Sequence, residues 1–286
     1  MDSNALPDNA IAQTPRWLVG VDFSSAPTQR KPITMALGER RGQVLRLQSL
    51  HSLATHEALV QALAEMPAWL GAFDFPFGLP RELIEALGWP REWSALIAHY
   101  SALSRADIRA AFAGFCNARP SGAKFVHRAT DIPAGASPSM KWVNPPVAYM
   151  LHAGVPLLLH VGADLPGLHA GDAARVALEG YPGMLARELI ERRSYKSDAA
   201  AKQTPERLIA RKDLVEALEQ GRSRIGLRLK LSHAQRDQLV ADARGDLLDA
   251  VLCLMQSGWA ASRADFGRPA DADRLEGWIV SADLYA

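Results

Sequence analysis

The sequence predicts a mixed α/β fold in which helices cover both faces of one sheet. Three β-leaning runs separated by short turns come first, which indicates an antiparallel meander, and later strand-like runs alternate with helical stretches, which indicates parallel strands. The 286 residues, of which 48% are hydrophobic, suffice for one large domain, and no shift in composition marks a second. We therefore expect a single domain over 1–286, with a disordered tail over 1–15 and a helical and loop insertion over about 77–153.

The first part of the chain predicts the meander and a crossover to a further strand. Apolar runs bounded by proline or glycine turns predict strands over 17–23, 33–38 and 44–50. Leu59, Leu63 and Met66 recur at helical spacing, so we expect an amphipathic helix over 55–66. The nearly continuous apolar run 69–75 is typical of a strand buried on both faces, and we expect it beside the first strand.

The rest of the chain is predicted to be mainly helical. Helices are expected over 81–87, 93–103 and 105–116, and the segment 120–138, rich in Gly, Pro and Ser, is interpreted as a loop that orders when substrate binds. Beyond it the patterns predict helices over 146–153, 184–193, 205–219 and 232–257, and short strands over 156–162, 175–178 and 277–281. Ser232 suits the N-cap of the longest of these helices.

Charge and cysteine content exclude some classes of protein. Lys and Arg number 32 against 31 Asp and Glu, so no global field favours a polyanionic partner. The two cysteines, Cys116 and Cys253, lack the spacing of a zinc ribbon, and a reducing cytoplasm is the simplest location. Residues 1–15 lack the basic and apolar segments of a signal peptide, and no run reaches the length that spans a bilayer. We expect a cytoplasmic protein without a membrane partner.

Acidic residues near the ends of strand-like runs are the main functional signal. They are Asp22, Asp74 and Glu179, with Asp246 and Asp249 before an apolar helical run. A carboxylate among apolar neighbours is costly to desolvate unless a positive group offsets it. If the first and fourth strands are neighbours, Asp22 and Asp74 converge at one edge of the sheet, while Asp246 and Asp249, three residues apart, share a helix face.

This arrangement predicts a metal site for phosphate chemistry, with Asp22, Asp74, Asp249 and Asp246 as ligands. Oxygen ligands without nearby His or Cys select Mg²⁺ or Mn²⁺ over zinc. Two such ions about 3.5–4 Å apart activate a water and stabilise the leaving oxygen of a phosphodiester. Apart from His233, no histidine stands near the late helix, so a general base is not assigned.

Simpler interpretations stay open for single residues. Asp22 could cap the turn after its strand, and Glu179 could pair with Arg187 or Lys196. The helix-borne acids could stabilise the helix dipole, although we favour a functional role for Asp249.

Basic residues provide candidates for substrate binding. Lys124 and Arg128 in the Gly and Pro-rich segment, and Lys196 further on, could hold phosphates over the metal site. A solvated surface position is the alternative for each of them.

Several motifs together resemble the domain of unknown function 429 family, in the family's order and from about Trp17 to Ala282. They are Gly20-Val21-Asp22, Phe73-Asp74-Phe75-Pro76, Glu179-Gly180-Tyr181-Pro182-Gly183, Tyr195-Lys196-Ser197, Thr204-Pro205-Glu206-Arg207, Asp246-Leu247-Leu248-Asp249-Ala250 and Glu276-Gly277-Trp278-Ile279. Members of this family are described as predicted nucleases with an RNase H-like fold. The resemblance implies that fold here, and DNA, RNA or a hybrid as substrate.

The resemblance also implies roles for the acidic residues. Asp22 would be the central metal ligand, Asp74 the second, and Asp249 or Asp246 the ligand from the final helix. Glu179 would match the acidic motif of the family's fifth strand and join the catalytic residues.

Two other functions compete with a nuclease. Actin-like and sugar-kinase-like phosphotransferases or ATPases share the order of core strands, but they hold phosphates on Gly-rich hairpins. Here the turn 23–27 after Asp22 has no glycine, and Pro76 removes a backbone donor after Asp74. The second competitor is a nucleic-acid-binding module that kept the fold and lost turnover.

Overall fold

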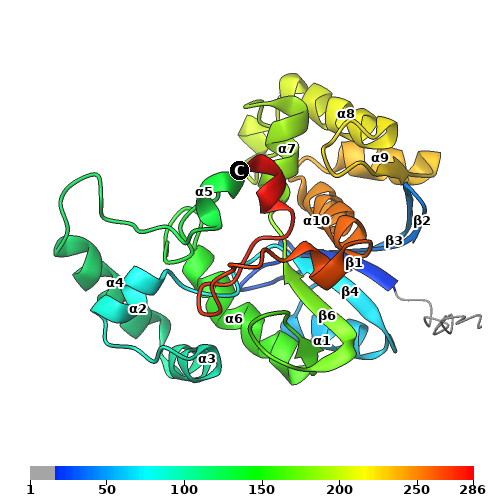
Figure 1. The fold of residues 1–286 in the computed structure, drawn as a ribbon. Coiled ribbons are helices and arrows are strands. Elements are labelled where there is room, and N and C mark those ends of the chain that lie inside the picture. Colours follow the sequence, from blue (N-terminus) through cyan, green and yellow to red (C-terminus); the bar gives the residue numbers. More distant parts are fainter. Residues whose placement is uncertain (1–16) are drawn as a thin grey trace, which may run out of the picture.

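A computed structural model describes residues 17–286, so the tail expected over 1–15 lies outside the described residues. The chain forms a seven-stranded sheet with strand order β5-β6-β4-β1-β2-β3-β7 (Figure 1). The strands are β1 (Trp17–Asp22), β2 (Ile33–Arg41), β3 (Val44–Leu53), β4 (Trp69–Phe73), β5 (Ala163–Asp164), β6 (Asp172–Glu179) and β7 (Arg228–Lys230).

The strand directions confirm the predicted mixed sheet. β1, β2 and β3 form the antiparallel meander, and β4 runs parallel to β1, with β6 parallel to β4. The short strands β5 and β7, neither of which was predicted, extend the two ends of the sheet with parallel pairing. This architecture is consistent with the RNase H-like fold that the resemblance implies.

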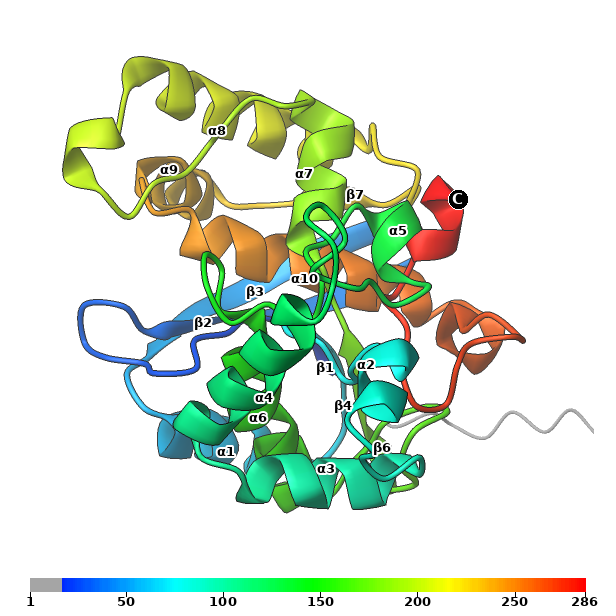
Figure 2. The ribbon, with the colours of Figure 1, turned by 90° about the vertical axis from the view of Figure 1, so that its left-hand side faces the viewer.

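Helices cover both faces of the sheet. They are α1 (His56–Ala64), α2 (Arg81–Ala86), α3 (Trp93–Ala102), α4 (Arg105–Asn117), α5 (Asp131–Ala134), α6 (Val147–His160), α7 (Pro182–Ile190), α8 (Pro205–Gln220), α9 (His233–Ala241) and α10 (Asp246–Ala260). Figure 2 shows α7 to α10 on one side of the strands and α1, α3 and α6 on the other. Two buried apolar clusters fill these layers, so the strands β1, β4 and β6 contact protein on both faces.

Local signals explain where several helices begin. The Thr55 side chain accepts a hydrogen bond from the Ala58 backbone at the start of α1, and Leu59 and Leu63 of that helix are buried as predicted. Ser232 caps α9 as expected, and Gln235 completes a capping box with it.

The predicted strand over 156–162 is wrong, because most of this segment belongs to α6. Ala148, Leu151, Val155 and Leu158 are buried at helical spacing, and Pro156 is accommodated inside the helix. A short apolar run cannot be assigned to strand or helix by periodicity alone. The helix ends at His160, and only the two residues of β5 add to the sheet nearby.

The predicted long helix over 232–257 is also wrong, because it is two helices. α9 ends at Ala241, and Gly245 adopts a left-handed conformation, with φ +75°, as the N-cap of α10. The Asp242 side chain accepts a hydrogen bond of 2.9 Å from the Leu247 backbone and so satisfies a donor in the first turn of α10. This break places Asp246 and Asp249 in the first turn of the helix.

The predicted strand over 277–281 is reduced to one bridge. Ile279 pairs with Glu179 in parallel, and the Val280 backbone donates a hydrogen bond of 2.9 Å to the Glu179 carbonyl. Gly277 and Ser281 have φ of +75° and +67°, so the extended conformation stops on both sides. The C-terminal segment nevertheless lies at the end of β6, beside the site described below.

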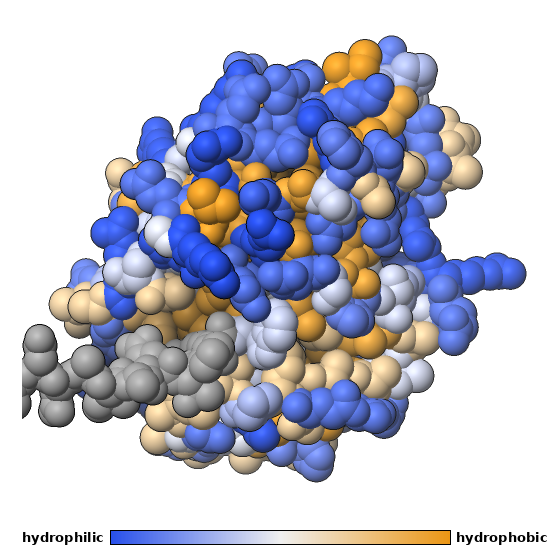
Figure 3. Space-filling model, turned by 90° about the vertical axis from the view of Figure 1, so that its right-hand side faces the viewer, coloured by the Kyte–Doolittle hydropathy of each residue, from blue (hydrophilic) through white to orange (hydrophobic). Residues whose placement is uncertain are grey.

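No helix within residues 17–286 is both long and apolar enough to cross a membrane. On the face drawn in Figure 3, apolar side chains lie in patches between hydrophilic ones, and hydrophilic side chains dominate the upper part of the molecule.

Candidate metal centre

Three carboxylates meet at the carboxyl edge of the sheet. Asp22, Asp74 and Asp249 each contribute an oxygen, and these oxygens all lie within 4.8 Å of one another. β1 and β4 are neighbours with Val21 opposite Phe73, and the Asp74 backbone continues the pairing with a hydrogen bond of 2.9 Å to the Val21 carbonyl. Asp22 and Asp74 therefore leave adjacent strands at the same level and on the same face, as the sequence predicted.

The third carboxylate depends on a close approach between α10 and β1. Gly20 allows it, because a Cβ atom at this position would lie 2.1 Å from both the Ala250 carbonyl oxygen and the Leu254 nitrogen. The hydroxyl of Thr34, which pairs with Asp22 across β1 and β2, donates a hydrogen bond of 2.7 Å to the Asp246 carbonyl. The first turn of α10 is thus fixed directly over the strand end.

Two consecutive residues, Tyr195 and Lys196, orient the Asp249 side chain. Its side chain is fully buried, the Tyr195 hydroxyl donates to its Oδ1, and the Lys196 ammonium donates to its Oδ2. The Arg211 guanidinium in turn donates a hydrogen bond of 2.8 Å to the Tyr195 carbonyl and holds this segment in place. Charge-assisted hydrogen bonds of this kind fix a carboxylate firmly.

The surroundings of Asp22 and Asp74 raise the pKa values of both carboxyls. Burial raises the pKa of Asp22 well above its usual range, and the nearby Asp249 and Asp74 carboxylates add to the effect. Burial and then Asp249 raise the pKa of Asp74 to about 7, although Lys196 acts in the opposite direction. Like charges this close disfavour full ionisation unless a cation joins them.

The carboxylate cluster has fewer cationic partners than acidic groups within the residues that the structure describes. Among residues 17–286, Asp22 and Asp74 form no ion pair with a Lys or Arg, and Lys196 is bonded to Asp249. When all three carboxylates are ionised, their charge exceeds that of the Lys196 ammonium by two. One divalent cation would balance this excess, and the donors available to it are all oxygens, the set that Mg²⁺ and Mn²⁺ prefer.

Asp246 lies beside the cluster without joining it. Its Oδ2 is buried and accepts no hydrogen bond, and the Arg244 Nε lies 3.7 Å away. Burial, followed by Asp242 and Asp249, raises the pKa of Asp246 to about 6. Of the two acids of α10, Asp249 is thus the one whose side chain reaches the other carboxylates.

Glu179 lies at the end of β6 but outside the carboxylate cluster. It pairs with Phe73 across β4 and β6, so its side chain leaves the sheet on the face opposite to that of Asp74. There it accepts hydrogen bonds of 2.7 and 2.5 Å from Arg128 and one of 2.9 Å from the Phe77 backbone. Its partner is therefore Arg128, and the expected pairing with Arg187 or Lys196 is wrong.

Arg128 is the centre of a buried ion network. Its guanidinium, 1% exposed, also donates to the Asp131 carboxylate at 2.7 Å and to the Glu276 carbonyl at 3.0 Å. Burial by itself would lower the pKa of Arg128, but the Glu179 and Asp131 carboxylates raise it above its ordinary value. Arg128 thus anchors the segment 120–138 to β6 and to the C-terminal segment.

The three predicted phosphate-binding residues have different surroundings. Lys124 is exposed and lines neither of the two cavities beside the cluster. Arg128 reaches the edge of one cavity, but its donors are occupied by the ion network. Only Lys196 contacts the carboxylate cluster.

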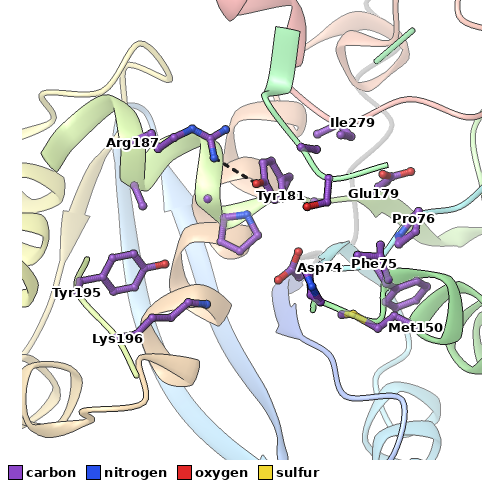
Figure 4. A pocket seen from close by; sticks show the side chains of 18 of the residues that line it. Asp74, Phe75, Pro76, Met150, Glu179, Tyr181, Arg187, Tyr195, Lys196 and Ile279 are labelled. Carbon is purple, nitrogen blue, oxygen red and sulfur yellow. Dashed lines mark hydrogen bonds between the residues drawn. The ribbon is translucent and has the colours of Figure 1, made fainter. Parts of the chain in front are cut away.

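Two cavities flank the cluster. The larger, about 630 Å³, is lined by parts of α7, the segment 191–196 and the chain leading into α6, and Asp74 and Lys196 lie on facing sides of it (Figure 4). The smaller, about 420 Å³, lies toward the β1–β2 connection. Asp74 therefore borders both cavities and Asp22 the smaller one, so these two carboxylates are accessible to a ligand.

Sequence reasoning missed Tyr195, Thr34 and Gly20 as residues that shape the site. Tyr195 and Gly20 stand in motifs that carry the family resemblance, so a signal for them existed. Thr34 gave none, because its contact with α10 joins residues 212 positions apart.

Comparison with protein-family models, with curated proteins and with solved structures found no match. A function for this chain is therefore inferred from the geometry of its site.

Proposed function

We propose that the chain is a divalent-metal-dependent phosphodiesterase acting on nucleic acid, with Mg²⁺ or Mn²⁺ held by Asp22, Asp74 and Asp249. The observation that carries the proposal is the convergence of these three carboxylates, with Lys196 as their one ion-pair partner within residues 17–286. Membership of the family with motifs like these, and a location in the cytoplasm, where two free buried cysteines stay reduced, are parts of the same proposal.

The donor set fits a hard divalent ion. Asp22 and Asp74 are partly exposed, Asp74 lines both cavities and Asp22 lines the smaller one, whereas Asp249 is buried. A bound divalent ion supplies a water of lowered pKa and neutralises charge on a phosphoryl oxygen. The sequence suggested two ions, but the charge on Lys196 favours one.

The chain's own residues supply orientation and charge. Tyr195 and Lys196 hold Asp249 in one rotamer, so this ligand needs no reorganisation when an ion binds. The Lys196 ammonium also lines both cavities, where it would attract an anionic phosphate to the cluster. Asp246 and Glu179 act as neighbours of the site in this proposal and not as ligands.

The test compares cleavage of labelled DNA, RNA and hybrid strands by wild type, Asp22→Asn and Asp74→Asn in the presence of Mg²⁺ or Mn²⁺. We expect metal-dependent cleavage by wild type and a loss of at least about 100-fold in each variant, since each removes a charged ligand. Asp271→Asn, at an exposed position away from the site, is the matched control and should retain full activity.

Equal background cleavage by wild type and the two site variants would contradict the proposal. Consumption of ATP by the wild type without cleavage of any nucleic acid would favour the phosphotransferase alternative instead.

A further inference from the structure

The two cavities share part of their lining beside the acidic cluster, and we refer to them together as the groove. Both are lined by Asp74, Pro145, Met150 and Lys196, so each opens on the same carboxylate from a different side. We call the larger the α7 cavity and the smaller the β1–β2 cavity. A substrate that places a phosphate at the carboxylates would extend into both.

The α7 cavity combines apolar walls with arginines. Met150, Tyr181 and Ile279 line it together with prolines, and Arg187 stacks over the Tyr181 ring at 5.3 Å and donates to the Tyr181 hydroxyl (Figure 4). Arg192, also in the lining, is exposed and has no hydrogen bond or ion pair within residues 17–286. Apolar surfaces beside an unpaired cation, here Arg192, are what an unstacked base and its phosphate require.

The β1–β2 cavity has a larger share of charged and hydroxyl side chains. It is lined by the serines Ser24, Ser25 and Ser197 and by the basic residues Lys31 and Arg244, which lie beside Asp198 and Asp246 of the same lining. Hydroxyl and cationic groups of this kind contact the sugar and phosphate parts of a nucleotide and carry no base readout. The α7 cavity thus suits the base of one nucleotide, and the β1–β2 cavity suits the sugar and phosphate of the nucleotide on the other side of the scissile phosphate.

The sizes of the cavities favour unpaired nucleotides. Volumes of about 630 and 420 Å³ lie in the range of small-molecule pockets, about 300–1,000 Å³. A base that enters the α7 cavity must leave the stack, whereas duplexes are recognised across their grooves and backbone. The chain between Ala136 and Val147 lines one side of this cavity and α7 lines the other, so the base would be enclosed between them.

We propose that the substrate is a single-stranded nucleic acid, with one unpaired base in the α7 cavity, its phosphate toward Arg192, and the adjoining nucleotide in the β1–β2 cavity. This inference rests on the proposed function, because it places the scissile phosphate at the acidic cluster. It adds the strandedness of the substrate and the residues that select it.

The test measures binding separately from turnover. Asp22→Asn/Asp74→Asn replaces two ionisable carboxyls by amides of the same shape, and fluorescence anisotropy in EDTA then compares single-stranded DNA and RNA hexamers with hairpin duplexes of the same sequence. We expect the single strands to bind at least about 10-fold more tightly. In this background Ser137→Trp, which fills the α7 cavity from its partly exposed wall, should weaken single-strand binding by at least about 10-fold. Arg192→Ala should weaken it less.

Two exposed substitutions are the matched controls. Ser121→Trp and Arg109→Ala lie outside both cavities and should leave binding unchanged, and thermal unfolding of every variant verifies that it folds. Tighter binding of duplexes, or no effect of Ser137→Trp in a folded protein, would overturn the inference.

The same experiments separate this inference from the proposed function. Single-strand binding that Ser137→Trp abolishes, without cleavage by the wild type, would contradict the hydrolase and support the binding groove. Metal-dependent cleavage of duplexes that Ser137→Trp does not affect would do the reverse.

Discussion

Two acidic clusters, one buried and one partly exposed, lie at the same edge of the sheet, and they differ in the cations that neutralise them. Glu179 and Asp131 share the guanidinium of Arg128, whose side chain is 2% exposed, and all three side chains belong to one hydrogen-bonded network. Within the described part of the chain, Asp22, Asp74 and Asp249 share one ion-pair partner, the ammonium of Lys196, whose side chain is 44% exposed. Glu179 pairs with Phe73, the residue before Asp74, so the two clusters lie one residue apart in strand register.

The difference separates a structural role from a functional one. A buried carboxylate that finds a cation within the protein stabilises a particular arrangement of the chain, here the attachment of the segment 120–138. A cluster whose charge exceeds that of its protein cations is destabilising alone, and it is stabilised when an external cation binds. Strand position alone does not distinguish the two, because Asp22, Asp74 and Glu179 all stand at strand ends.

The largest effect is expected from removing the internal cation. Arg128→Met should lower the free energy of unfolding by about 3–5 kcal/mol, because two buried carboxylates lose their partner. Urea denaturation measures the change, with Arg109→Met on the exposed face of α4 as control. A loss below about 1 kcal/mol would show that Arg128 is not the cation on which this cluster depends.

A smaller loss is expected from separating α10 from β1. Gly20→Ala should destabilise the protein by about 2–3 kcal/mol and weaken divalent-ion binding, because the added methyl group meets the backbone of α10 at 2.1 Å and displaces Asp249. Gly114→Ala is the matched control. That glycine is exposed within α4 and an added Cβ meets nothing within 4 Å, so stability should rise by about 0.5–1 kcal/mol. Unchanged ion affinity in a folded Gly20→Ala protein would refute the role assigned to this contact.

The stability of the ion-free protein should fall with rising pH because of the carboxylate cluster, whereas a carboxylate in a salt bridge makes stability rise with pH. Asp74 has a pKa of about 7 in the folded protein, against about 4 when unfolded, so between these values the folded state binds more protons. The stability of the ion-free protein should therefore fall as the pH rises from 5 to 8. Asp74→Asn removes this group. At pH 8 the free energy of unfolding of this variant should therefore be about 1–2 kcal/mol higher than that of the wild type.

Urea denaturation in EDTA at pH 5 and 8 measures both effects. The advantage of Asp74→Asn should disappear at pH 5, where the wild-type carboxyl is protonated in the folded state. A variant less stable than wild type at pH 8 would mean that the protein already neutralises Asp74.

Much of the fold and half of the site could be predicted from the sequence. The meander, the neighbouring positions of β1 and β4 and the convergence of Asp22 with Asp74 follow from local patterns and from the shared carboxyl edge of parallel strands. The break between α9 and α10 had a local signal in Gly245, which the continuous apolar pattern obscured.

Other parts had no local signal. Glu179 and Arg128 pair across 51 positions, and no local pattern links the two residues. The sequence therefore could not predict that Arg128 neutralises this acid. The Lys196 contact with Asp249 spans 53 positions and changes the charge of the cluster, which in turn changes the expected number of ions. Periodicity and propensity describe what a segment becomes, whereas these pairings depend on tertiary packing.

Titration calorimetry with Mn²⁺ at pH 8, where protons compete least, tests the central claim directly. Wild type and the Asp271→Asn control should bind one ion per chain, and Asp74→Asn should bind none in the same concentration range. Failure of the wild type to bind Mn²⁺, or equal binding by Asp74→Asn, would contradict the assignment of this cluster as a metal centre.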